Sequence, residues 1–285
     1  GALDYSSTSP GTVILFDPRT LQPPLDPDGD GVYHLTTITI PAGVTLRLRA
    51  DRAGAAPVQW LATGAVVIDG TLDLSGENGH ASAAASPRLP SLPGPGGFGG
   101  GAGGREPNRP PQAGFGPGGG PITGSSIGAN AGYATQGNTC ATGIAGSTYG
   151  NGFLSPLLGG SGGGGGGFVS LNGAGGGAGG GAMLLASSVS ISINGAILAK
   201  GGVDGDVNPF SGGSGSGGAI RLVTPLITGS GTLDVRGGDC RSCQNGGPGR
   251  IRLETLQNTF TGTSLGDTRV VTLIPAPLVI SPTSL

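Results

Sequence analysis

The chain has 285 residues, of which 64 are glycine and 23 are proline, and only 11% are charged. The formal net charge of −2 argues against nucleic-acid binding, which requires a basic surface. Disordered chains combine low hydrophobicity with high net charge, and a nearly neutral chain that is 35% apolar does not fit that description. We therefore expect a folded protein of one or two domains.

No apolar run approaches the roughly 18 residues that a membrane-spanning helix needs, so we expect no membrane span. The chain opens with "GALDYSS", without Met and without a charged and then apolar leader. We interpret this start as a secreted product whose export signal has been removed, located outside the cell or on its surface. An arbitrary starting point would explain the same feature equally well.

The first local motif is "DPDGDG" at residues 26–31. Asp26, Asp28 and Asp30 alternate as in the first half of an EF-hand loop, which predicts a calcium site. The pattern then departs from that loop, because Thr37 stands where a bidentate Glu belongs. The alternative is an Asp-rich turn whose side chains bond their own backbone. "VDGDVN" at 203–208 invites the same two interpretations, and there we favour the turn.

Residues 34–76 predict short strands, because apolar and polar residues alternate in "TTITI", "VTLRLRA" and "VVIDGTLDL" between turn signals. Similar segments recur at 60–79, 179–202, 216–238 and 246–256. The alignment places three sets of apolar residues at matching positions: Met183, Ile220 and Ile251; Leu185, Leu222 and Leu253; Leu72, Ile197 and Leu233. Such repeats indicate a solenoid, whose stacked coils share one core. We predict an all-β parallel β-helix, with a β-sandwich as the alternative.

A glycine-rich insertion at 81–181 separates the first copy of the repeat from the second. No residue from Pro110 to Ala199 is charged, so little holds this segment in solvent. Glycine-rich chains form threefold helices of the polyproline-II type, which can pack closely through backbone hydrogen bonds. We predict a lobe of packed polyglycine-II-type helices, and the alternative is a disordered loop. The predicted organisation is an extended segment at 1–33, a solenoid at 34–256 around the insertion, and a strand-like segment at 257–285.

Three cysteines are present: Cys140, Cys240 and Cys243. The "CRSC" pair lies between glycine runs rather than at a helix start, which disfavours a redox motif, and only two histidines are present for a zinc site. We expect a disulfide, either Cys240–Cys243 or one of these residues with Cys140, as is typical of an oxidising extracellular setting.

The "IPAGVTL…GTLDLSG" and "GGSGSGGAIRL…GTLDVRGG…GGPGRIRLE" segments resemble glycine-rich secreted β-solenoid proteins of bacterial surfaces, over residues 34–80 and 160–256. The composition also resembles the glycine-rich adhesin tips of certain tailed phages. These resemblances imply a surface location and supply no catalytic residue. Polysaccharide-cleaving β-helices use clustered carboxylates, but Arg221 and Arg252 with Glu254 nearby are typical of a solvated face with cross-strand pairs, so we expect no enzyme.

The terminal segments 12–18 and 268–285 are strand-like and lie outside the repeats. The open ends of a solenoid can pair with another chain, so we predict a filament or surface layer formed by head-to-tail donation of the C-terminal segment, or its use as a cap on its own coil. The apolar residues expected to mediate self-assembly are Val270, Val271, Leu273, Leu278 and Ile280. The alternative is an adhesin that binds surface glycans through exposed aromatic residues, with these candidates: Phe98, Phe115, Tyr133, Tyr149 and Phe153.

Overall fold

The computed structural model describes residues 1–21, 26, 30–82, 88–105, 109–122, 127–139, 143–167, 172–205, 210–239 and 245–274. Its elements begin with β1 (Leu3–Asp4), β2 (Val13–Leu15), the 3-10 helix η1 (Pro18–Thr20), β3 (Val32–Leu35), β4 (Ile38–Ile40), β5 (Thr45–Arg47) and α1 (Ala50–Ala53). They continue with β6 (Val58–Ala62), β7 (Val66–Ile68), β8 (Thr71–Asp73), β9 (Ala182–Ser187), β10 (Ser190–Ile193) and β11 (Ala196–Leu198). The last are β12 (Ala219–Gly229), β13 (Thr232–Asp234), β14 (Arg250–Phe260), β15 (Thr263–Leu265) and β16 (Asp267–Thr272).

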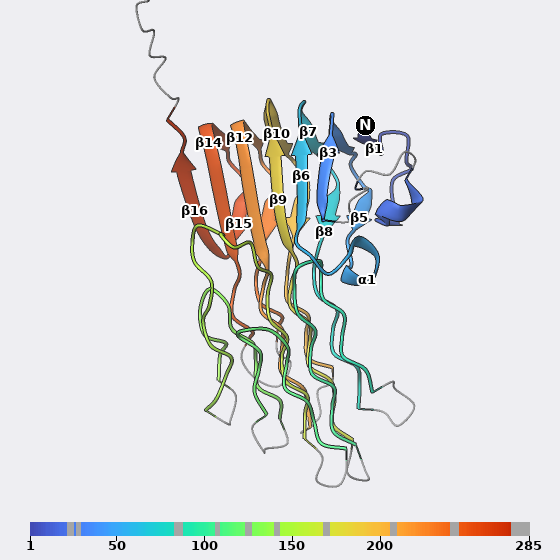
Figure 1. Ribbon diagram of the computed structural model, residues 1–285, viewed down its shortest axis with the longest axis vertical. Helices are drawn as coiled ribbons and strands as arrows, with labels where there is room; N and C mark the ends of the chain where they lie inside the picture. The colour runs from blue at the N-terminus through green and yellow to red at the C-terminus, as the bar shows by residue number, and fades with distance from the viewer. Residues whose placement is uncertain are drawn as a thin grey trace, which may run out of the picture.

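The described strands stand side by side in three rows, and every strand pair within these rows is parallel (Figure 1). Row one is β3-β6-β9-β12-β14-β16, and row two is β1-β4-β7-β10-β12-β14, with β12 and β14 long enough to serve both. Row three is β2-β5-β8-β11-β13-β15. The all-β prediction is confirmed, and parallel pairing does not fit the antiparallel sheets of a β-sandwich.

Within each row, the inward apolar side chains of neighbouring strands lie in register. The alignment of the repeats is confirmed here, because Leu222 pairs with both Leu185 and Leu253, while Ile220 pairs with Met183 and Ile251. In row three, Ile197 pairs with Leu72 and Leu233. These residues are at most 2% exposed and belong to one continuous core. The core forms because alternate side chains of every strand point inward, so each new strand buries the apolar side chains of the strand before it.

The glycine-rich segments run away from the sheets as long traces that lie side by side (Figure 1). Within one of these runs, residues 174–182, successive backbone N–H groups bond to different neighbours, and the same neighbour returns at every third residue. One neighbour contributes the carbonyl groups of residues 80, 77 and 74, which accept from residues 175, 178 and 181. A second contributes those of 101, 98 and 95, which accept from 176, 179 and 182. A third contributes those of 210, 213 and 216, which accept from 174, 177 and 180.

Glycine is required here because the backbones approach too closely for a side chain. A Cβ atom on Gly177 would lie 2.1 Å from the carbonyl oxygen of Gly202, and one on Gly176 would lie 2.1 Å from that of Gly163. The neighbouring residues Ala174 and Ala178 are fully buried, so a methyl group fits only at particular positions. Backbone hydrogen bonds to surrounding runs compensate for the entropy that ordering glycine costs.

Candidate assembly site

At the two ends of the strand rows, pairing between the described strands stops. At the C-terminal end of row one, β16 pairs with β14 on one side, and no described strand pairs with its other side. Asp267 and Leu273 donate their N–H groups to Gly249 and Thr255 of the same chain. Because alternate residues of a parallel strand bond to opposite neighbours, Thr268, Val270 and Thr272 direct their backbone groups outward. Within the described part of the chain, this end is therefore a free strand edge.

The side chain of Val270 marks the same end from inside the core. Val270 is in register with Leu253, which continues the inward stack through Leu222. Leu253 is 2% exposed, but Val270 is 52% exposed because nothing described lies beyond it. This is the position where a further strand would bury apolar surface.

At the N-terminal end, an aromatic side chain covers the first strand of row one, whereas no described strand covers the edge of row three. Phe16 is 2% exposed and packs edge-on against Tyr33 and Trp60, with ring centroids 5.7 and 5.6 Å apart. Burial raises the pKa of Tyr33 to about 12, which keeps this phenol neutral. The edge of row three is different, because no described strand pairs with the far side of β2. On β2, Val13 and Leu15 are in register with Thr45 and Arg47 on the outer face, and they are 67% and 40% exposed.

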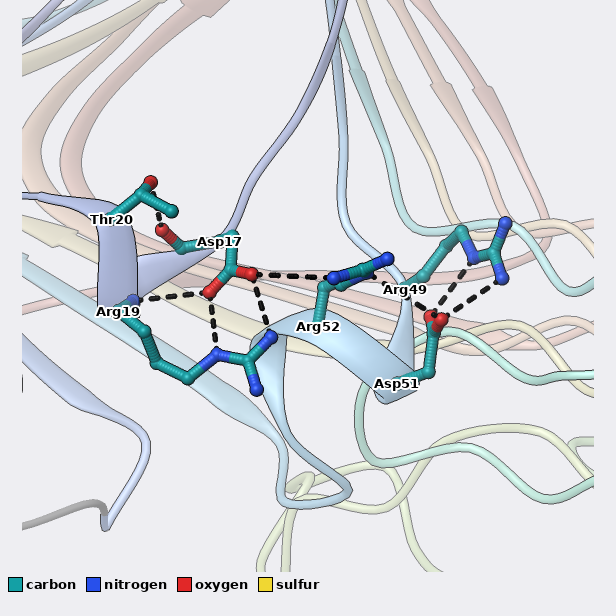
Figure 2. Close-up of polar contacts among 6 residues, drawn as sticks. All are labelled: Asp17, Arg19, Thr20, Arg49, Asp51 and Arg52. Carbon is teal, nitrogen blue, oxygen red and sulfur yellow. Dashed lines mark hydrogen bonds and ion pairs between the residues drawn. The ribbon is translucent and has the colours of Figure 1, made fainter.

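A chain of ion pairs links Asp17, the residue after Phe16, to α1 (Figure 2). Asp17 accepts hydrogen bonds from Arg19 Nε at 2.7 Å and Nη2 at 2.6 Å, and it lies 3.8 Å from Arg52 on α1. Arg52 also lies 3.8 Å from Asp51, and Asp51 is paired with Arg49 at 3.0 Å. The hydrogen bond from Arg19 lowers the pKa of Asp17 to about 2. These pairs join η1 to α1 beside the buried aromatic residues.

A second charged cluster lies on the outer face of row one. Arg221 and Arg252 are directly opposite each other on β12 and β14, and Glu254 accepts a hydrogen bond from the Nε of each at 2.7 Å. Burial acts to raise the pKa of Glu254, but the bonds from both arginines outweigh it and the net pKa is lowered. The predicted cross-strand pairing is confirmed, with one carboxylate separating two like charges.

The glycine-rich runs are fixed to the sheet by arginines that sequence analysis did not single out for this role. Arg250 donates to the carbonyl oxygen of Tyr149 at 2.6 Å and lies over the ring of Tyr133. Arg252 donates to the carbonyl oxygen of Gly152 and lies 5.4 Å from the ring centre of Phe153. The sequence held two related signals, the uncharged 110–199 segment and the arginines of the repeat. It could not show that they meet, because the contacts join residues about a hundred positions apart.

The residues predicted to bind calcium are placed only in part, because Asp28 lies outside the described residues. Asp26 accepts hydrogen bonds from the backbone N–H groups of Asp30 and Gly31, and Asp30 accepts one from Val32 at 2.8 Å. These bonds are those of an Asp-rich turn. Within the part of the chain that the structure describes, no group of three His, Cys, Asp or Glu side chains could hold a metal ion. Calcium binding stays a prediction.

Of the predicted self-assembly residues, Val270 and Val271 lie in β16 and pair with β14 of their own chain. The N–H group of Leu273 bonds to Thr255, so this segment extends its own row of strands. Leu278 and Ile280 lie outside the described residues, as do all three cysteines, Cys140, Cys240 and Cys243. Disulfide formation therefore stays a prediction.

The aromatic candidates for glycan binding divide into two groups. Tyr133 is 1% exposed and donates its hydroxyl to Leu158, and Tyr149 donates to Gly159, so both act as spacers between backbone runs. Burial raises the pKa of both tyrosines. Phe115 and Phe153 are 49% and 66% exposed, while Phe98 is partly buried.

Comparison with family models, with curated proteins and with solved structures finds no match for this chain. Among the described residues, no helix combines the length and the apolar character that crossing a membrane requires. The candidate site is therefore defined by the geometry of the described residues. At one end of the rows lies a free strand edge with the exposed side chain of Val270, and at the other end lies the free edge of β2.

Proposed function

We propose that this chain is an extracellular structural protein whose copies stack head to tail into a filament or surface layer. The observation that carries the proposal is a strand edge at each end of the three rows with which no described strand pairs. Exposed edges pair readily with other strands, and a contact between unlike ends does not close on itself. We interpret the three rows as the faces of a parallel β-solenoid.

The stacking contact that fits best joins β15 of one copy to β2 of the next. Both strands have three residues and belong to row three. Thr263 donates to Gly231 and Leu265 accepts from Val235, which leaves the backbone groups of Ser264 directed outward. Continuing the register would place Ser264 between the outward groups of Val13 and Leu15. Val270 would meet the cover formed around Phe16, which would bury its apolar side chain.

The glycine-rich runs support a structural role for the rest of the chain. We interpret the threefold return of hydrogen-bond partners in residues 174–182 as a lobe of polyglycine-II-type helices. Closely packed, uncharged backbones of this kind make a rigid body with few mobile side chains. Rigidity suits a component of a fibre or layer that must transmit load.

Charged substitutions at the two ends test the proposal by sedimentation velocity. Val270→Lys places a charge at the C-terminal end, and Leu15→Lys places one at the N-terminal end. Val189→Lys is the matched control, because Val189 is 53% exposed, as Val270 is 52% exposed, but does not lie at either end. We expect large assemblies for the unmodified chain and for the control, and single chains for each end variant.

Mixing the two end variants tests the direction of the contact. Each variant keeps one intact end, so an equal mixture should form dimers and stop there. Dimers of the Leu15→Lys variant by itself would mean that two C-terminal ends pair with each other, and assemblies of the Val270→Lys variant would mean that this end is not used. Either result would overturn the head-to-tail proposal.

A second candidate function is an adhesin that binds surface glycans. The exposed rings of Phe115 and Phe153 favour it, because aromatic faces are common contacts for sugars. Loss of glycan-array binding in Phe115→Ala and Phe153→Ala variants, with unchanged sedimentation, would support this function over assembly.

A further inference from the structure

An apolar groove of about 520 Å³ crosses the outer face of row one. Its floor includes Leu61 on β6, Ala186 on β9 and Val223 on β12, which are in register with one another. Two positions earlier on the same strands, the outward residues are Gln59, Leu184 and Arg221. All three of these floor residues are apolar, whereas two of the three residues beside them are polar, as is usual on an outer face.

The rim of the groove adds apolar side chains that are left in water. Leu256 is 44% exposed and Ile274 is 88% exposed, and both line the groove together with Leu273. Single exposed apolar residues are ordinary, but several gathered around one hollow mark a binding surface. Among the described residues, His34 is the one titratable side chain that lines it, so a neutral apolar occupant fits better than a charged one.

We propose that residues 275–285 of the same chain occupy this groove, running back across the strands from Ile274 toward His34. The last described residues, Leu273 and Ile274, already line the groove, so the chain leaves the described structure from inside it. The segment reads "PAPLVISPTSL" and has no charged side chain. A tethered segment reaches an adjacent site at a high effective concentration, which favours it over a separate partner.

The lengths agree with this path. Neighbouring strands are about 4.8 Å apart, so β12 and β6 lie about 10 and 19 Å from β16 along row one. Pro275 and Pro277 favour an extended polyproline-II chain, which advances about 3.1 Å per residue. Residues 278–280 then lie about 12 to 19 Å beyond Ile274. This range places Leu278, Val279 and Ile280 over the floor formed by Val223, Ala186 and Leu61.

This inference does not depend on the proposed function, because the groove lies on the outer face of row one and the free edges lie at the ends. The two also fail differently. If the segment is displaced, assembly through Val270 and Leu15 is unaffected; if the ends do not assemble, the groove is still occupied.

Hydrogen exchange of the full chain, read by mass spectrometry, tests the docking. We expect the amides of residues 278–280 to exchange at least about tenfold more slowly than those of an unstructured chain. Leu278→Asp/Ile280→Asp should remove this protection, and Ser281→Asp/Ser284→Asp, which adds the same charge beside the apolar residues, should retain it. Ala186→Glu should remove the protection from the groove side.

Dilution identifies the occupant. Protection that stays constant as the protein is diluted supports docking within one chain. Protection that disappears on dilution would mean that the segment binds a neighbouring copy, and the proposal would be wrong. Exchange at unprotected rates in the unmodified chain would also overturn it, as would full protection in both Leu278→Asp/Ile280→Asp and Ala186→Glu.

Discussion

Val270 and Leu253 are in register on neighbouring strands and point into the same core, yet Val270 is 52% exposed and Leu253 only 2%. The difference arises because Leu253 has a described strand on either side, while Val270 has one on a single side. The opposite end of row one is closed by Phe16 over Tyr33. The molecule is thus asymmetric along its rows, which is the geometry that a head-to-tail contact needs.

The glycine-rich runs should tolerate no added methyl group at their closest contacts. We predict that Gly177→Ala destabilises the protein by about 3 kcal/mol, because its Cβ would lie 2.1 Å from a carbonyl oxygen and the backbones would have to separate. Ala178→Gly, the reverse change at the next residue, should cost about 1 kcal/mol. Chemical unfolding measures both, and equal costs would contradict the close packing.

The cover over the N-terminal end should depend on one aromatic side chain. We predict that Phe16→Ala lowers the free energy of unfolding by about 3 kcal/mol, because it empties a fully buried site against Tyr33 and Trp60. Phe153→Ala, which removes a ring that is 66% exposed, is the control and should cost about 0.5 kcal/mol. Thermal unfolding of the two variants distinguishes these outcomes, and a Phe16→Ala protein as stable as the control would contradict the role of Phe16.

The ion pair of Asp17 should make the N-terminal cover sensitive to acid. The pKa of Asp17 is lowered from 3.8 to about 2 in the folded protein, so its contribution to stability is complete above about pH 4 and is lost as the pH falls through about 2. We predict that Asp17→Asn lowers the melting temperature at neutral pH and that the difference from the unmodified chain vanishes near pH 2. A difference that persists at that pH would contradict the pairing with Arg19.

The stability of the protein should depend on the charged form of the carboxylate between Arg221 and Arg252. We predict that Glu254→Gln costs about 2 kcal/mol, because two arginines that now share a charged acceptor would face each other without it. Since the pKa of Glu254 is lowered in the folded state, the difference from the unmodified chain should shrink as the pH falls below the ordinary range of a Glu side chain. Denaturant titrations at neutral and acidic pH measure both effects, and a cost that does not change with pH would contradict them.

Sequence alone predicted the strands of the repeats and the register of their inward apolar residues. Leu185, Leu222 and Leu253 could be aligned because an inward position recurs at every second residue of each strand and the repeat brings it back in each copy. The pairing of Arg221 with Arg252 followed from the same alignment. The boundary expected at residue 256 falls inside β14, because that strand serves two rows and runs to Phe260.

Other features could not be predicted because they depend on distant segments meeting. Nothing local to Phe16 indicates that its ring will lie against Trp60, which is 44 residues away and on another strand. Glycine composition favours close packing of backbones, but it does not specify which run accepts from Gly177 or where Arg250 will meet Tyr149. These contacts depend on the whole set of hydrogen bonds between runs, and no short sequence pattern encodes that set.

Negative-stain electron microscopy of the purified unmodified chain tests the central claim most directly. Each of the three rows holds six strand positions, and strands are about 4.8 Å apart, so a head-to-tail stack should repeat about every 29 Å along its axis. We predict filaments with that repeat, absent from the Val270→Lys variant and present in the Val189→Lys control. Discrete particles of one or two chains, or filaments that survive the Val270→Lys substitution, would contradict end-to-end assembly.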